Sequence, residues 1–137
     1  MTVRAELSEK NKYYIDKHRY YELKHFCLQY PIWKKLYSEI DGLVSCTYDP
    51  VRFSKSNTPS DPTSKLAEER LLYFDRMKLV EQTALAADSD LASYILKAVT
   101  EGLSYTYLKT KLEMPCGRDM YYDRYRRFFW LLDKIRD

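Results

Sequence analysis

The chain has few of the residues that bend the backbone or crosslink it. Its 137 residues include 3 glycines and 3 cysteines, and runs of β-branched residues are rare. With so little glycine, we expect no glycine-rich phosphate loop, and helices are favoured over sheet. Cys27, Cys46 and Cys116 are odd in number and form no Cys-x-x-Cys pair. A disulfide framework and a zinc site are therefore not expected, and a reducing cytoplasm suits the chain better.

Long apolar segments are also missing. The longest apolar run, from Phe128 to Leu132, is far too short to span a membrane. The first ten residues include two basic and two acidic side chains, so we predict no signal peptide. The expectation is a soluble cytoplasmic protein without a membrane partner.

Patterns typical of catalytic and metal sites are not found in the sequence. His18 and His25 are seven residues apart, which is two helical turns, whereas a zinc-binding helix needs a spacing of four. No nucleophilic side chain lies in a recognisable catalytic motif, and Cys116 is interpreted as a turn residue. We predict a protein that is not an enzyme and uses no cofactor or metal.

The chain does contain ample material for a helical core. Hydrophobic residues make up 45% of it, and 14 residues are tyrosine. Most of these tyrosines are interpreted as residues that pack their rings in the helical core while their hydroxyls reach water. The alternative is that their rings stack on nucleic-acid bases.

The N-terminal part, residues 1–44, is predicted to be a helical hairpin. Residues 9–29 contain charges and aromatics without a breaker and form its first helix. Tyr30 ends that helix, because the residue before a proline is pushed out of the helical region, and Pro31 can start the next one. Asp41-Gly42 is expected to end the second helix. The apolar stripe of the second helix consists of Ile32, Trp33, Leu36, Tyr37 and Ile40.

A linker and a long helix follow. Residues 45–60 are polar, rich in turn formers and without periodicity, so we predict a linker or surface loop. Asp61-Pro62 is a strong helix start, because aspartate accepts from the unpaired N–H groups of a first turn and proline needs no partner there. The helix is expected to reach about Ala87, within a helical domain over residues 61–137. One face of it carries Leu66, Tyr73, Met77, Val80 and Ala84.

Residues 91–136 are predicted to form a helix-turn-helix. Gly102 ends a first helix, Ser104 caps a short second one, and residues 114–117 turn the chain into a third helix over 118–136. A step of about 100° per residue places one apolar face on the third helix, made of Tyr121, Tyr125, Phe128, Leu132 and Ile135. The opposite half carries Asp119, Tyr122, Asp123, Arg126, Arg127 and Trp130. The fold class predicted for the whole chain is all-α.

The distribution of charge predicts duplex DNA as the partner. The net charge is +3, but residues 10–35 carry +5 and residues 104–137 carry +3, whereas residues 61–90 carry −3. Basic ends suit contact with phosphate, and three helices with a basic last one are what a major-groove reader needs. The predicted groove-facing residues are Arg118, Tyr122 and Arg126, and the predicted phosphate contacts are Arg127, Lys109 and Lys111. The alternative is a solvated surface on which Asp119 and Asp123 pair with these arginines.

Three parts of the chain together resemble a known family. The polar stretch that ends in Ser60-Asp61-Pro62-Thr63, the helix after it, and Met120-Tyr-Tyr-Asp-Arg-Tyr-Arg-Arg-Phe-Phe129 are similar to the ArpU/RinA-type transcription regulators of phages and prophages of Gram-positive bacteria. The resemblance covers roughly residues 61–135. It implies transcription control in a bacterial host cell, with a module like the sigma-factor region that reads the −35 promoter element. Its positioning helix would be 104–113 and its recognition helix 118–129. The chain departs from the family pattern at Lys109, where a small residue is usual, and at the acidic pair Asp119 and Asp123.

A protein-binding role is the alternative function. Trp130 lies off the predicted apolar face of the third helix, and the stripe around Trp33 and Tyr37 needs a cover. Either surface would serve as a homodimer interface, as a contact to host RNA polymerase, or as an inhibitor of a host enzyme or defence complex in the manner of an anti-CRISPR protein.

Overall fold

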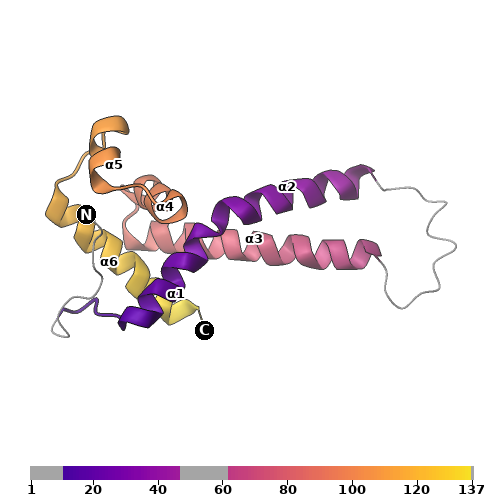
Figure 1. The fold of residues 1–137 in the computed structure, drawn as a ribbon, viewed down its shortest axis with the longest axis horizontal. Coiled ribbons are helices and arrows are strands. Elements are labelled where there is room, and N and C mark those ends of the chain that lie inside the picture. The colour runs from indigo at the N-terminus through magenta and orange to yellow at the C-terminus, as the bar shows by residue number, and fades with distance from the viewer. Residues whose placement is uncertain (1–10, 47–61, 137) are drawn as a thin grey trace, which may run out of the picture. The chain divides into compact units, whose positions relative to one another are not determined.

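The computed structural model describes residues 11–46 and 62–136, and these residues form helices without any strand. The predicted all-α class is confirmed. The helices are α1 (Lys17–Leu28), α2 (Tyr30–Cys46), α3 (Pro62–Ala87), α4 (Ala92–Glu101), α5 (Tyr105–Lys111) and α6 (Arg118–Ile135) (Figure 1). They belong to two compact units, one made of residues up to 30 and from 79 onward, the other of residues 31–78. Among the residues described, no helix combines the length and the apolar character needed to cross a membrane.

The first helix begins later than predicted. Asp16 caps it, because the Asp16 carboxylate accepts a hydrogen bond from the N–H of His18 at 3.0 Å, and α1 therefore starts at Lys17. Before the cap, the Asn11 side chain accepts from the N–H of Tyr13 at 2.8 Å and folds residues 11–14 into a turn. The predicted helical residues 11–16 are thus not helical, and residues 9 and 10 lie outside the described part of the chain. The turn brings Tyr13 into the core.

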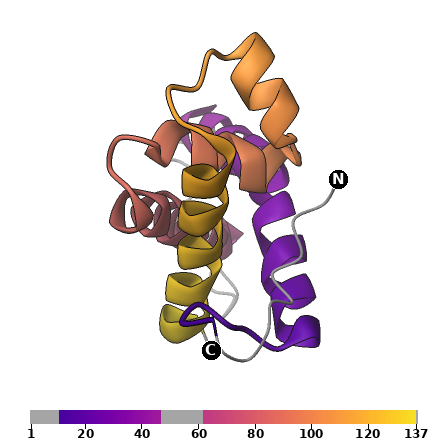
Figure 2. The same ribbon diagram turned by 90° about the vertical axis from the view of Figure 1, so that its left-hand side faces the viewer.

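In the first unit, α1 packs against α4 and α6, and Figure 2 shows α1 and α6 side by side. The ring of Tyr20 on α1 meets the ring of Phe129 on α6 edge-on, with centroids 5.1 Å apart. The completely buried side chains of this core come from α1, α3, α4, α5 and α6, and they are Leu23, Cys27, Val80, Ile95, Leu108, Phe128, Phe129 and Leu132.

In the second unit, α2 pairs with the N-terminal part of α3. The Arg70 guanidinium donates to the Tyr37 hydroxyl at 3.0 Å and forms an ion pair with Asp41 at 3.0 Å. The rings of Tyr37 and Phe74 lie 6.1 Å apart. The predicted hairpin over 1–44 joined α1 to α2, so the structure groups the chain differently: α1 packs with α4 and α6, and α2 packs with α3. Of the apolar stripe of α2, Trp33 and Ile40 are buried, and Tyr37 packs against Phe74 of α3, whereas Ile32 is exposed.

The ends of α2 and α3 test the predicted breaks. The chain does break between α1 and α2, at Gln29, and Pro31 lies in the first turn of α2. The predicted stop at Asp41-Gly42 is wrong, because a glycine inside a helix costs only about 1 kcal/mol and α2 continues to Cys46. The bounds predicted for α3 are confirmed at Pro62 and Ala87. Most of the predicted linker, residues 47–60, and the capping Asp61 lie outside the described residues.

The breaks predicted around α4, α5 and α6 are confirmed. Gly102 ends α4 in the left-handed region, with φ of 71°, and its N–H donates to the carbonyl of Ala98. The Ser104 hydroxyl accepts from the N–H of Tyr107 at 3.2 Å and caps α5. Residues 112–117 then lead into α6, which begins at Arg118.

The predicted apolar face of α6 needs one correction. Tyr121, Phe128 and Leu132 are buried as expected, but Ile135 is 55% exposed and Phe129 is completely buried. The reason is that α6 contacts both α1 and α4, so its buried arc is wider than one stripe and takes in Phe129. Ile135 is the last residue of α6 and follows the buried Leu132 by nearly one turn, and it is exposed to solvent.

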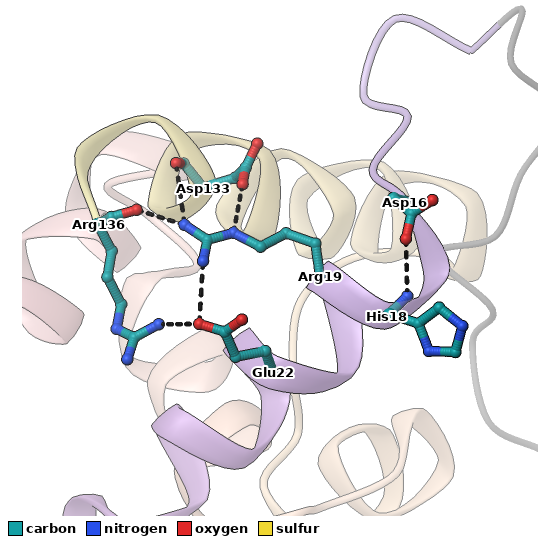
Figure 3. A network of polar contacts seen from close by, with 6 residues as sticks. All are labelled: Asp16, His18, Arg19, Glu22, Asp133 and Arg136. Atoms are coloured by element: carbon teal, nitrogen blue, oxygen red, sulfur yellow. Dashed lines mark hydrogen bonds and ion pairs between the residues drawn. The ribbon is translucent and has the colours of Figure 1, made fainter.

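A network of charged side chains ties α1 to the C-terminal end of α6 (Figure 3). The Arg19 guanidinium donates to the Asp133 carboxylate at 2.6 Å, to the Glu22 carboxylate at 3.0 Å and to the carbonyl of Arg136. The Arg136 side chain donates to Glu22 at 2.7 Å, and this hydrogen bond holds the pKa of Glu22 below its ordinary value. The network fixes the C-terminal end of α6. It does not involve the N-terminal end of the helix, where Arg118 lies.

Asp88 holds the junction of α3, α4 and α6 in place. Its carboxylate accepts from the Arg124 side chain at 2.9 Å and from the N–H groups of Asp90 and Leu91 at 2.9 and 3.2 Å. Burial raises the pKa of Asp88, but the hydrogen bonds from Arg124 and the two N–H groups lower it by more, so the pKa lies below its ordinary value. The ionised carboxylate therefore stabilises the fold at neutral pH, and this contribution is lost as the pH falls below about 4.

We expect Asp88→Asn to lower the free energy of unfolding by about 1–3 kcal/mol at about pH 7. The loss should shrink as the pH falls towards about 3, because the native carboxyl group is then being protonated as well. Urea denaturation followed by circular dichroism at both pH values measures the difference. Asp90→Asn, which changes an exposed carboxylate two residues away, is the control and should cost less than about 0.5 kcal/mol. An equal loss for Asp88→Asn at both pH values would contradict the assignment.

Candidate nucleic-acid interface

Arg118 occupies the first position of α6 and is exposed. Its guanidinium lies over the ring of Tyr105, 5.0 Å from the centroid, and also near the ring of Tyr122 at 5.9 Å. Cation–π contacts of this kind restrict the arginine side chain without consuming its N–H donors. Arg118 is thus held in one region of space, at the junction of α5 and α6, with its donors available.

Tyr122, which was predicted to face the groove, is half-buried. Its ring packs against Tyr105 at 5.9 Å and against Tyr121 at 5.3 Å. Its clearest role in the structure is to form, with Tyr105, the aromatic support under Arg118. The supporting residue Tyr105 was not singled out from the sequence, although it follows the Ser104 cap and therefore had to lie at the start of α5.

Lys109 has a structural role that the sequence did not reveal. Its ammonium donates to the carbonyl oxygens of Met114 at 3.1 Å and Cys116 at 3.0 Å. These bonds close the turn between α5 and α6, so two of the three N–H donors of Lys109 are already used. Lys111, two residues on, is exposed, and within the described residues no hydrogen bond or ion pair holds its ammonium. Of the two predicted phosphate contacts on α5, Lys111 is the available one.

The face of α6 that starts at Arg118 becomes more buried along the helix. Arg126 lies two turns further on, is half-buried, and its Nε is buried without a hydrogen-bond partner among the described residues. Arg127 is also half-buried. On this face Arg118 and Asp119 are exposed, whereas Arg126 and Arg127 are half-buried, so the structure separates Arg118 from Arg126 in accessibility although the sequence grouped them.

Within the described residues, the acidic side chains of α6 form no ion pair with Arg118. Asp123 pairs with Arg124 at 2.5 Å, and Arg124 in turn pairs with Asp88. Asp119 is exposed in the first turn, where a carboxylate interacts favourably with the helix dipole. The sequence had suggested that Asp119 and Asp123 pair with the groove-facing arginines, but for Asp123 the partner is Arg124, a residue to which no role had been assigned.

The residues predicted to bind a protein partner have partners inside the units. In the first unit, the ring of Trp130 meets the ring of Tyr13 edge-on at 5.5 Å, and the Lys134 ammonium lies 4.2 Å from its centroid. In the second unit, Trp33 is only 2% exposed, and Tyr37 packs on Phe74. The sequence could not foresee the cover over Trp130, because it comes from a non-helical segment that had been predicted as helix.

Metal binding finds no support in the described part of the chain. His18 and His25 are both exposed on α1, and no three His, Cys, Asp or Glu side chains gather there as a metal site would require. The arrangement at the start of α6 is instead an exposed arginine packed on the rings of Tyr105 and Tyr122. No protein-family model matches the chain, and no similar protein was found among the curated proteins or the solved structures.

Proposed function

We propose that this protein binds duplex DNA through the first turn of α6, as a regulator of transcription. The observation that carries the proposal is the position of Arg118, which is exposed at the first residue of α6 and is held over Tyr105 and Tyr122. In major-groove readers the first turns of the recognition helix reach the base edges. An arginine can donate two hydrogen bonds to the O6 and N7 atoms of guanine, and a restricted arginine loses less entropy on binding.

The other proposed contacts to DNA depend on which lysine and arginine side chains are available to bind phosphate. Lys111 on α5 and Arg127 on α6 would bind phosphate, which fixes the register of a protein on DNA without reading sequence. Lys109 would shape the turn between the two helices, and Tyr122 would position Arg118. In this proposal α5 is the positioning helix and α6 the recognition helix, as the resemblance to ArpU/RinA-type regulators implies. That resemblance also makes phage or prophage genes in a bacterial host the expected targets.

Selection from a pool of random duplexes, followed by fluorescence anisotropy on the enriched sequence, tests this proposal. With two or three phosphate contacts, the affinity should fall roughly 10–40-fold between about 50 mM and about 200 mM salt. An enriched sequence with guanine at a fixed position would agree with a base contact by Arg118. If no sequence is enriched, or if the affinity is insensitive to salt, the chain does not read DNA in this way. Co-purification of a protein without DNA would then favour the protein-binding alternative.

A further inference from the structure

The first unit contains a cavity of about 150 Å³ between α1, α4, α6 and the start of α5. Tyrosine rings form much of its wall, and they belong to Tyr20, Tyr105, Tyr121, Tyr122 and Tyr125. Aliphatic side chains from α1 and α4 complete the apolar part. Of the described residues that line the cavity, Lys24 alone is charged.

The Tyr121 hydroxyl and the Lys24 ammonium on this wall can both pair with a ligand. Tyr121 is 2% exposed, yet its hydroxyl makes no hydrogen bond with any described residue. This hydroxyl is not a buried group left without a partner, because among the described residues only the Nε of Arg126 is one. A ligand in the cavity would therefore replace water as the hydrogen-bond partner of Tyr121. Burial also raises the pKa of Tyr121, which keeps the hydroxyl protonated and able to donate. The ammonium of the half-buried Lys24 likewise has no hydrogen bond or ion pair within the described residues.

We propose that this cavity binds a small aromatic carboxylate, with its ring among the tyrosines and its carboxylate at Lys24 and Tyr121. Size supports a single ring, because an apolar cavity of about 150 Å³ can hold a benzene molecule. Aromatic side chains favour an aromatic ligand through edge-to-face and offset contacts. One ammonium and no carboxylate on the wall suit a singly charged anion better than a phosphate, which usually needs more cations.

The cavity shares two residues with the proposed DNA interface. Tyr105 and Tyr122 line the cavity and also support Arg118. A ligand that shifts either ring would therefore also shift the Arg118 guanidinium that contacts it. We expect occupancy of the cavity to change the affinity for duplex DNA, and this part of the inference rests on the proposed function.

Titration of 4-hydroxybenzoate into isotopically labelled protein, without DNA, tests the site itself. We expect saturable NMR shifts for the amides of residues 98–105 and 121–125, complete below roughly 5 mM because so small a ligand has limited affinity. Lys24→Met and Tyr121→Phe should each weaken binding about fivefold. The neutral 4-hydroxybenzamide should bind the original protein about fivefold more weakly, and Lys24→Met should not weaken it further.

Lys97→Met provides the matched control, since Lys97 is exposed on α4 and does not line the cavity. Its affinity for 4-hydroxybenzoate should be unchanged. The site is overturned if no amide shift saturates, and the assignment of the anion is overturned if Lys24→Met binds the acid as well as the original protein does. Circular dichroism of each variant shows whether it is folded.

A second measurement separates the site from its coupling to DNA. Saturating 4-hydroxybenzoate should change the affinity for the enriched duplex at least threefold in the original protein and leave it unchanged in Lys24→Met. Unchanged affinity in both proteins overturns the coupling while the NMR shifts still establish the site. If the protein binds no duplex at all, the proposed function fails, and the titration without DNA still decides whether the cavity is a ligand site.

Discussion

Replacing Arg118 by glutamate is expected to weaken duplex binding by about 100-fold or more. A bidentate contact to guanine contributes about 1–3 kcal/mol, and a factor of ten in affinity corresponds to about 1.4 kcal/mol. The new carboxylate also repels the phosphates, which adds to the loss. Because Arg118 is exposed and forms no hydrogen bond or ion pair within the described part of the chain, the fold should be unaffected. Fluorescence anisotropy measures the affinity, and circular dichroism checks the fold.

Two further variants show whether the loss of affinity for DNA comes from the hydrogen-bond geometry of Arg118 or from its charge. Arg118→Lys keeps the charge but not the planar fork, so it should weaken binding by about tenfold and relax the preference for guanine. Lys65→Glu makes the same change in net charge as Arg118→Glu on an exposed side chain of α3, and it should cost less than about threefold. If Arg118→Glu and Lys65→Glu weaken binding equally, the effect is one of net charge, and the assignment of Arg118 is wrong.

Phe129→Ala is expected to have the largest effect on stability, lowering the free energy of unfolding by about 3–5 kcal/mol. Phe129 is completely buried, and its ring contacts Tyr20, Tyr125 and Phe128 at centroid distances of 5.1, 5.0 and 5.0 Å. The substitution removes these contacts and leaves a cavity between α1 and α6. Since domains are typically stable by about 5–15 kcal/mol, the variant should retain only a marginal fold. Urea denaturation followed by circular dichroism measures the change.

Tyr107→Ala is the control for this experiment, because it removes an aromatic ring that is 44% exposed on α5. It should change the free energy of unfolding by no more than about 0.5 kcal/mol. A loss below about 1 kcal/mol in Phe129→Ala would mean that α6 does not pack on α1 as described.

Local signals in the sequence were sufficient where a helix end depends on its own residues. Gly102, Ser104 and Pro62 lie where the predicted breaks put them, because a left-handed glycine, a capping hydroxyl and a first-turn proline act within a few residues. Gly42 shows the limit of such signals. A glycine inside a helix is only mildly unfavourable, and α2 continues past Gly42 to Cys46.

The contacts between distant segments could not be read from the chain. Helical periodicity gives the face of α6 but not the width of its buried arc, and so Phe129 was missed. The same holds for the candidate interface. The sequence identified Arg118, but it could not show that Lys109 closes a turn or that Arg124 neutralises Asp123. Each of these outcomes depends on which backbone or carboxylate the fold brings within about 3 Å of a flexible side chain.

The packing of the two tryptophans has a spectroscopic consequence. The chain contains 2 tryptophans, and each compact unit holds one of them, Trp33 in the second unit and Trp130 in the first. Trp33 is almost fully shielded from solvent, whereas Trp130 is half-exposed beside Tyr13 and Lys134. Their emission spectra should therefore differ in wavelength and in access to quenchers. With Trp33→Phe the remaining signal reports only on the unit that carries α6, and with Trp130→Phe it reports only on the pair formed by α2 and α3.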